Sequence, residues 1–405
     1  MKNTDDFEKY KQAVMEKIDC SGEIEDSKVY EWIDAVIMEA ANEKYMRLEE
    51  KTSLRTRLFH SLRKLDILQE LIDDPDITEI MINGTNNIFV EKNGKIEKCE
   101  KQFESAEKLE DVIQQMVAKA NRIVNETTPI VDTRLENGSR VNIVLPPIAL
   151  NGPAVTIRRF PDKPIVMKDL IRFGAISEDV SEFLKKLVKS KYNIIVCGGT
   201  GSGKTTFLNV LSNYIPCDER IITIEDSAEL QILQIPNLVR METRNANIEG
   251  CNQITIRDLI KTALRMRPNR IVIGEVRGSE AVDLIQCLNT GHEGSISTIH
   301  SNNSKDMISR LEMMVLMGVD IPLSAIKSQI AAGVDIIIHL GRMRDKSRKV
   351  LEITEIEGFR ENQIILNPIY QYKETSENMD KVLGKLVQCG ELKNKEKLER
   401  EGFIL

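Results

Sequence analysis

A glycine-rich octapeptide with the pattern G-x-x-x-x-G-K-[ST] reads Gly198-Gly199-Thr200-Gly201-Ser202-Gly203-Lys204-Thr205. The apolar run 193–197 directly precedes it and predicts a buried strand, and an apolar stretch that begins near Thr206 predicts a helix directly after it. Glycines let consecutive backbone N–H groups curl around a phosphate, and a helix N-terminus adds its partial positive charge. The stretch therefore predicts a phosphate-binding loop over residues 198–206.

The same loop indicates the kind of phosphate compound. We expect Lys204 to reach the β- and γ-phosphates of a nucleoside triphosphate, and the Thr205 hydroxyl to bind Mg²⁺. A GTPase normally carries an Asn-Lys-x-Asp element. The closest match, residues 394–397, reads Asn-Lys-Glu-Lys and fails at its last position. ATP is therefore the expected nucleotide.

Around the loop the chain alternates between short apolar runs and helical stretches. The runs at 221–224, 271–273 and 295–299 are rich in β-branched residues and nearly continuous, as strands buried on both faces should be. Apolar residues between 281 and 288 fall at helical spacing. This alternation predicts an α/β domain, which we assign to residues 169–405.

The end of that domain shows two further patterns. Residues 335–340 and 350–356 flank a charged loop, 342–349, and predict a hairpin. The last twenty or so residues are mostly lysine and glutamate with spaced leucines. For this end we expect a solvated helix or tail.

The first part of the chain has another organisation. Residues 1–60 predict a helical segment, in which apolar residues from Val29 to Ala40 share one face. Residues 61–160 predict a compact, smaller α+β domain. The two prolines of the stretch Phe160 to Pro164 disfavour regular structure, and we assign a linker to 161–168.

The α+β assignment rests on short strands and one helix. Asn-Gly pairs, which favour hairpin turns, separate the expected strands. The expected strands are 79–82, 88–91, 95–99, 134–135, 140–145 and 154–158. A stretch with apolar residues at helical spacing, 109–120, lies between the third and fourth of them.

Two strands of the α/β domain end in acidic residues. ATP hydrolysis needs a carboxylate for the attacking water and another near the metal, and both should lie at carboxyl ends of parallel strands. The strand 221–224 runs into Glu225-Asp226-Ser227-Ala228-Glu229, and the strand 271–273 runs into Gly274-Glu275. We therefore expect the catalytic carboxylates among Glu225, Glu229 and Glu275.

Two of the four histidines, His292 and His300, flank the expected strand 295–299. They lie too far apart for the H-E-x-x-H pattern of zinc proteases. One interpretation makes them structural imidazoles, particularly His300. The other makes them hydrogen-bond partners of the γ-phosphate.

Composition narrows the class of protein. Hydrophobic residues make up 41% and charged residues 29%, which is typical of a globular chain. The net charge of −7 and the aromatic share of 4% disfavour a nucleic-acid translocase, so no nucleic-acid partner is expected. The seven cysteines form no C-x-x-C pair, and we see neither a signal peptide nor an apolar run long enough to span a membrane. We expect a cytoplasmic protein.

Four sequence boxes in this order resemble the secretion-ATPase superfamily of type II secretion, type IV pili and type IV secretion. The boxes are Gly198–Thr206 (Walker A), Ile222–Leu230 (Asp box), Ile271–Gly278 (Walker B) and Gly291–Asn302 (His box). The resemblance is closest to the CpaF branch, the assembly ATPases of Tad (Flp) pili. It includes residues 132–141 and 152–160 and covers about Leu65 to Pro368.

The resemblance implies a PAS-like N-terminal domain and a RecA-like ATPase domain, with ATP held between the two lobes of a hexameric ring. It implies that Glu229 is the general base, with Glu225 as the alternate, and that Glu275 supports Mg²⁺ and water. His292 and His300 become γ-phosphate sensors. The resemblance also supplies candidates for arginine fingers, namely Arg134, Arg140 and Arg158.

The implied partners are other copies of the chain and an inner-membrane platform protein, with only peripheral contact at the inner face of the cytoplasmic membrane. Two alternatives remain open: a type IV secretion ATPase that exports protein or DNA, and an assembly factor that binds ATP but hydrolyses it slowly. The boxes occur in motors that extend a pilus and in motors that retract one. The Asp box departs from many relatives of the pilus-motor branch, because Ser227-Ala228 replaces Pro-Val, and no Asp precedes Glu275.

Overall fold

The computed structural model describes residues 2–18, 24–92, 94–120, 122–159, 164–244, 246, 251–375 and 381–403. The chain divides into two compact units, Met1–Asp162 and Lys163–Leu405. Most of the stretch 160–164, which led to the linker assignment, lies outside the described residues. The last two residues of the expected linker, 167 and 168, belong to helix α6.

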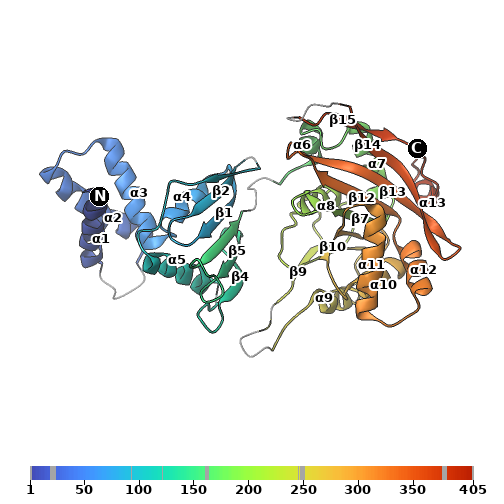
Figure 1. Cartoon of the computed structure of the whole chain (residues 1–405), viewed down its shortest axis with the longest axis horizontal. Helices are drawn as coiled ribbons and strands as arrows, with labels where there is room; N and C mark the ends of the chain where they lie inside the picture. The colour runs from blue at the N-terminus through green and yellow to red at the C-terminus, as the bar shows by residue number, and fades with distance from the viewer. Residues whose placement is uncertain are drawn as a thin grey trace. The chain divides into compact units, whose positions relative to one another are not determined.

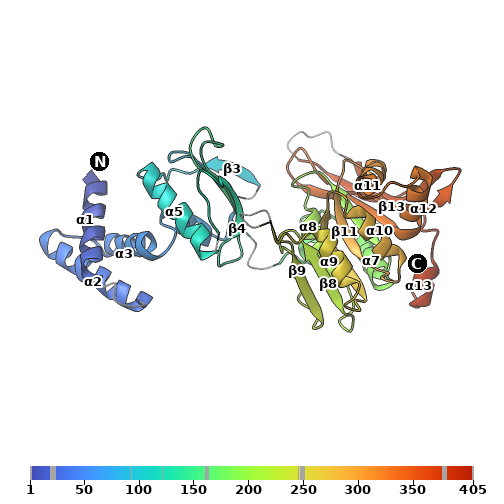
Figure 2. The same ribbon diagram turned by 90° about the horizontal axis from the view of Figure 1, so that it is seen from below.

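The first unit begins with three helices, α1 (Lys2–Lys17), α2 (Asp26–Glu43) and α3 (Leu48–Arg63), as Figures 1 and 2 show. Their shared core contains the α2 face expected from the sequence, including Ile33 and Val36. Helix α3 continues past residue 60, where we placed the end of the helical segment.

The rest of this unit is a six-stranded antiparallel sheet packed against helices α4 (Ile67–Asp73) and α5 (Ala106–Lys119). In spatial order its strands are β3 (Lys95–Lys98), β2 (Ile88–Lys92), β1 (Ile77–Asn83), β6 (Ala154–Arg158), β5 (Arg140–Val144) and β4 (Ile130–Arg134). The strand expected at 134–135 is wrong in extent. Strand β4 lies at the edge and has no fully buried residue, so its sequence lacks the apolar alternation that marks a strand.

The second unit contains a nine-stranded sheet that is parallel except at one end. Its spatial order is β15 (Gly384–Gln388), β14 (Gln363–Glu374), β13 (Arg348–Arg360), β12 (Ile336–Arg342), β7 (Ile194–Gly198), β11 (Ile296–His300), β10 (Arg270–Val276), β8 (Ile221–Glu225) and β9 (Leu238–Glu242). Strands β12 to β9 in this order run parallel, and β13, β14 and β15 pair antiparallel.

Helices cover both faces of the nine-stranded sheet (Figure 1). One face packs against α6 (Met167–Arg172), α7 (Glu178–Lys189) and α8 (Lys204–Ser212). The other packs against α9 (Ile256–Ala263), α10 (Ala281–Asn289), α11 (Ser304–Gly318) and α12 (Leu323–Gly333). Because both faces are covered, strands such as β7 and β8 are buried throughout, as expected from their apolar runs.

The C-terminal region differs from the expected solvated tail. The hairpin of β12 and β13 is confirmed, but β14 and β15 extend it and α13 (Glu396–Arg400) follows. Leu392 and Leu398 are buried in the core, and the Tyr192 hydroxyl donates to the Asn394 carbonyl oxygen at 2.5 Å. The expectation was wrong because the spaced leucines pack into the core of this unit, and Lys397, next to Leu398, donates to Asp335 at 2.7 Å.

The expected fold class is confirmed: an α/β unit with a mostly parallel sheet, preceded by a helical segment and a smaller α+β domain. In the part of the chain that the structure describes, no single helix has both the length and the apolar character needed to cross a membrane. Helices α11 and α12 meet such a criterion only as a pair, with a bend of 119° between them.

Candidate active site

The phosphate-binding loop connects β7 to α8 and is tightly packed. A Cβ atom on Gly198 would lie 2.4 Å from the Leu340 carbonyl oxygen and 2.6 Å from the Ser202 hydroxyl, so only glycine fits there. Gly203, with φ at 91°, adopts the left-handed conformation directly before Lys204, the first residue of the helix. Strand, glycine loop and helix therefore follow one another as the sequence predicts.

Three predicted site residues form a chain beside this loop. Lys204 is only 7% exposed, and its Nζ donates to the Gly199 carbonyl oxygen at 3.0 Å and to Nδ1 of His300 at 3.3 Å. A lysine ammonium cannot accept, so we assign the His300 proton to Nε2. That Nε2 lies 2.9 Å from Oε1 of Glu275. His300 therefore bridges the Walker A lysine and the Walker B carboxylate.

The charge state of His300 follows from its surroundings. Burial lowers the pKa of His300, and the charges of Lys204 and Arg277 lower it further, against the opposing effect of Glu275. The imidazole is therefore neutral at neutral pH. Arg277, which was not among the residues predicted for the site, donates to Oε2 of Glu275 at 2.7 Å and lies 3.8 Å from Asp226. Its position within the Walker B box was the available signal.

Glu225 anchors the turn that carries Glu229. Its Oε1 accepts hydrogen bonds from the backbone N–H groups of Glu229 at 2.8 Å and Leu230 at 2.9 Å. Burial raises the pKa of Glu225 to about 7, although the two backbone hydrogen bonds act in the opposite direction. The side chain is 2% exposed, and a Cβ on Gly274 would lie 3.1 Å from its Cγ. The half-buried Glu229 is thus held in a defined position on β8's carboxyl-terminal side.

His292 lies at the other end of β11. Strands β11 and β7 are parallel, with His300 opposite Gly198, so the phosphate-binding loop is at their carboxyl ends. His292 precedes β11, and its carbonyl oxygen accepts from the Ser295 hydroxyl at 2.7 Å. At about 3.3 Å per strand residue, roughly 15 Å of strand separates this edge from Lys204. His292 therefore lies at the edge of the sheet away from the phosphate-binding loop of its own chain, and its expected role as a γ-phosphate sensor stays a prediction.

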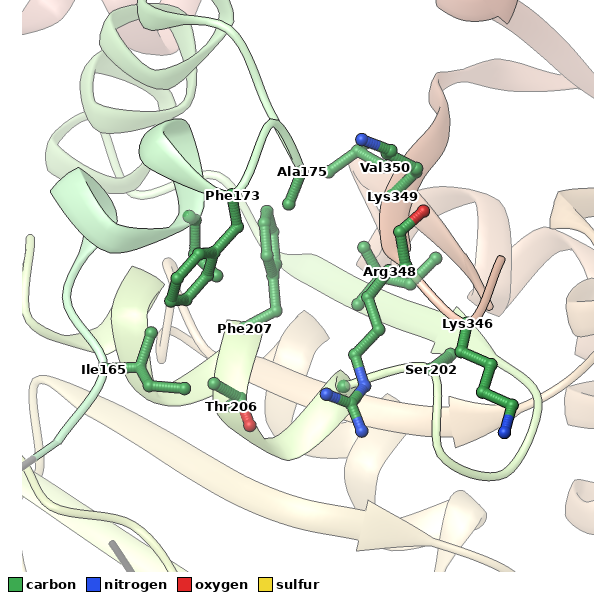
Figure 3. Close-up of a pocket in the computed structure, with 14 residues that line it drawn as sticks. Ile165, Phe173, Ala175, Ser202, Thr206, Phe207, Lys346, Arg348, Lys349 and Val350 are labelled. Atoms are coloured by element: carbon green, nitrogen blue, oxygen red, sulfur yellow. The ribbon is translucent and has the colours of Figure 1, made fainter. Parts of the chain in front are cut away.

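A pocket of about 230 Å³ adjoins the phosphate-binding loop. Figure 3 shows Ile165, Phe173 and Phe207 on one side of it. Thr206 also lines the pocket, which connects this apolar wall to the start of α8. The size and lining suit a purine base next to its phosphates.

The opposite side of this pocket is cationic. Lys346, Arg348 and Lys349, from the β12–β13 hairpin, line it. The Arg348 Nε donates to the Gly201 carbonyl oxygen at 2.9 Å. The sequence of the charged loop 342–349 does not reveal this position, because nothing local shows that β12 pairs with β7.

The three arginine-finger candidates lie in the first unit, in one row of its sheet. Arg134 is directly opposite Arg140, and Arg140 is directly opposite Arg158. Residues opposite one another share a face, so the three arginines share one face of the sheet. Arg140 forms a two-point ion pair with Asp132, at 3.1 and 2.7 Å, and Glu79 is opposite Arg158.

Comparisons with known proteins identify the family of this chain. The family described as type II/IV secretion system proteins matches residues 61–397. The conjugal transfer protein TrbB of Rhizobium radiobacter is 32% identical over 77% of this chain and 93% of its own length. The type IV secretion system protein VirB11 of Brucella suis biovar 1 is 31% identical over 68% of this chain and 84% of its own. The crystal structure of the pilus retraction motor PilT with bound ADP is similar in fold, with a TM-score of 0.52 at 19% identity over 84% of this chain and 87% of that chain.

Proposed function

The chain belongs to the type II/IV secretion system protein family, and on that basis we propose that it is a Mg²⁺-dependent ATPase that drives a secretion-type machine. The observation that carries this proposal is the contact chain from Lys204 through His300 to Glu275 beside the phosphate-binding loop. These three polar side chains converge there on one loop, at the carboxyl ends of parallel strands, where nucleotide sites in α/β folds lie.

The proposed binding mode uses groups of the second unit. The backbone N–H groups of residues 199–205 cradle the phosphates, and Lys204 reaches the β- and γ-phosphates. The base enters the pocket against Phe173 and Phe207. Thr205 and Glu275 are oxygen donors of the kind Mg²⁺ prefers, so they would hold this ion together with phosphate oxygens, and the ion would neutralise phosphate charge.

We assign the proton transfer to Glu229. In this proposal its carboxylate takes the proton of the attacking water, and Glu225 keeps the turn in place through two backbone hydrogen bonds. The neutral His300 is a donor at Nε2 and an acceptor at Nδ1, so loss of the γ-phosphate can change its contacts with Lys204 and Glu275. Glu275 thereby remains oriented by His300 and Arg277.

Arg134, Arg140 and Arg158 remain the proposed arginine fingers. The three arginines form one row on a single face of the sheet, and this shared face supports a common role for them. Guanidinium groups are suited to neutralise the charge that develops on a transferring phosphoryl group. In the proposed hexamer these arginines close on a nucleotide held by a phosphate-binding loop.

For the machine itself, we keep assembly of a Tad (Flp) pilus as the first proposal, with an inner-membrane platform protein as partner and the ring at the cytoplasmic face of that membrane. The names of TrbB and VirB11 favour a second candidate, export of protein or DNA by a type IV secretion machine. Cells that lack the chain would lose pili in the first case and transfer in the second. An assembly factor with slow hydrolysis is the third candidate.

The ATPase proposal is tested by phosphate release with ATP and Mg²⁺. We expect turnover by the wild type and a loss of at least a hundredfold in Glu229→Gln, with binding of a fluorescent ATP analogue retained. Glu293→Gln, a matched change at the opposite edge of the sheet, serves as control and should turn over normally. Normal turnover in Glu229→Gln would contradict the assignment of the base, and absence of nucleotide binding by the wild type would contradict the function.

A further inference from the structure

The β12–β13 hairpin brings a cation to the phosphate-binding loop from within the same chain. Strand β12 is the parallel neighbour of β7, with Leu340 opposite Gly198, so the hairpin loop begins beside the glycine loop. From the first residue of β13, Arg348 donates through Nε to the Gly201 carbonyl oxygen at 2.9 Å. A Cβ on Gly203 would lie 3.3 Å from Cδ of Arg348. The Arg348 side chain therefore lies directly against the loop.

The guanidinium of Arg348 has no carboxylate within ion-pair distance among the residues that the structure describes. Its neighbour Arg344 differs, because Nη1 of that residue donates to Glu374 at 2.9 Å and the pair is held at two points. Arg348 is exposed, and the group that its Nε contacts, the Gly201 carbonyl oxygen, carries no charge. An uncompensated guanidinium at a phosphate-binding loop favours an anionic ligand.

The hairpin loop is held in this orientation by Asp345. Its carboxylate accepts from the Ser347 backbone N–H at 3.0 Å, from the Ser347 hydroxyl at 2.6 Å and from the Val382 backbone N–H at 2.8 Å. These contacts fix the chain just before Arg348 and tie the loop to the segment that precedes β15. Figure 3 shows Arg348 on the side of the pocket opposite Phe173, with its guanidinium pointing toward Thr206 and Ser202.

We propose that Arg348 binds the α-phosphate of the nucleotide held by its own chain. This inference rests on the proposed function and adds a residue that none of the four sequence boxes contains. Lys204 accounts for the β- and γ-phosphates, and the apolar wall accounts for the base. Arg348 lines the pocket together with the apolar wall and also contacts the glycine loop at Gly201, and the α-phosphate is the group that connects base and ribose to the other phosphates. Asp345 acts through the loop and is a positioning residue.

Nucleotides with different numbers of phosphates distinguish the phosphate contact of Arg348 from that of Lys204. Fluorescent ADP is titrated into the full chain, and AMP is measured by competition. Arg348→Ala is expected to weaken both ADP and AMP by about tenfold, because a charge-assisted phosphate contact is lost. Lys204→Ala is expected to weaken ADP but leave AMP within twofold. Arg348→Lys should restore part of the affinity, and Asp345→Asn should show the Arg348→Ala pattern with a smaller loss.

Arg360→Ala removes an exposed arginine from the other end of β13 and serves as the matched control, with no expected change in either affinity. In turnover, Arg348→Ala should raise KM and leave kcat within about twofold. Wild-type AMP affinity in Arg348→Ala would overturn the α-phosphate contact while leaving the proposed function intact. Failure of the wild type to bind ADP would instead overturn the proposed function.

Discussion

Charged residues lie at both edges of the nine-stranded sheet, where its parallel strands begin and where they end. The residues at the two edges differ in their partners. At the carboxyl edge, Lys204, His300 and Glu275 contact one another beside the phosphate-binding loop. At the amino edge, Arg270 is fully buried, and its guanidinium donates to both carboxylate oxygens of Glu219 at 2.6 Å and to a backbone carbonyl oxygen. Both edges therefore contain buried charge, but only one places it against a ligand-binding loop.

The amino edge is closed by further partners within the chain. Asp335 accepts from the Asn193 backbone N–H at 2.7 Å and from Lys397 at 2.7 Å, which joins β7, β12 and the C-terminal helix. The Asn193 side chain accepts from the backbone of Gly294 at 2.8 Å and so holds the turn after His292. Charged residues at this edge bind one another. The comparison shows that burial alone does not reveal the role of a charged residue, whereas the group that it contacts does.

Arg270→Ala provides the largest test of this comparison. Removal of the guanidinium leaves Glu219 buried without its partner, and breaking a buried pair in this way costs about 3–5 kcal/mol. Urea denaturation should show that loss in the free energy of unfolding, while ATP turnover per folded molecule stays near the wild-type value. Wild-type stability of Arg270→Ala, or loss of turnover in the folded variant, would contradict the claim that the amino edge stabilises the fold and takes no part in turnover.

A smaller effect is expected from Glu225→Gln, measured as stability against pH. The pKa of Glu225 is raised from 4.5 to about 7, so between these values the folded protein holds a proton that the unfolded chain releases. The free energy of unfolding of the wild type therefore falls as pH rises through this window, by up to about 1.4 kcal/mol per pH unit.

Glutamine at position 225 does not titrate and keeps an acceptor for the two backbone N–H groups. The stability of Glu225→Gln relative to the wild type should therefore improve from pH 4.5 to pH 7 and stay constant above it. Urea denaturation at a series of pH values measures this difference. A difference that does not change with pH would show that the pKa of Glu225 is not raised in the folded protein.

Much of the fold could be predicted because its signals are local. The apolar runs of β7 and β8 and the glycine loop between strand and helix identify themselves over a few residues. Strand β14 escaped prediction because Pro368 interrupts its pattern, and proline within a run argues against a strand. The burial of Leu398 depends on packing against distant parts of the second unit, which no local pattern contains.

Some residues of the candidate site could likewise be predicted from local sequence, and others depend on contacts between distant segments. Lys204, Glu275 and His300 come together because their strands end at one edge, and strand ends can be read from sequence. The role of Arg348 depends on the pairing of β12 with β7, which joins segments far apart in the chain. His292 and His300 belong to one motif, but the strand between them carries its two ends to opposite edges of the sheet.

The measurement that tests the account most directly compares phosphate release by His300→Ala and His292→Ala, each with nucleotide binding measured alongside. We predict that His300→Ala loses at least tenfold in turnover and binds ATP within about threefold of the wild type, because the link between Lys204 and Glu275 is broken. His292→Ala should turn over within twofold of the wild type. Equal losses in the two variants, or a larger loss in His292→Ala, would contradict the assignment of chemistry to the carboxyl edge.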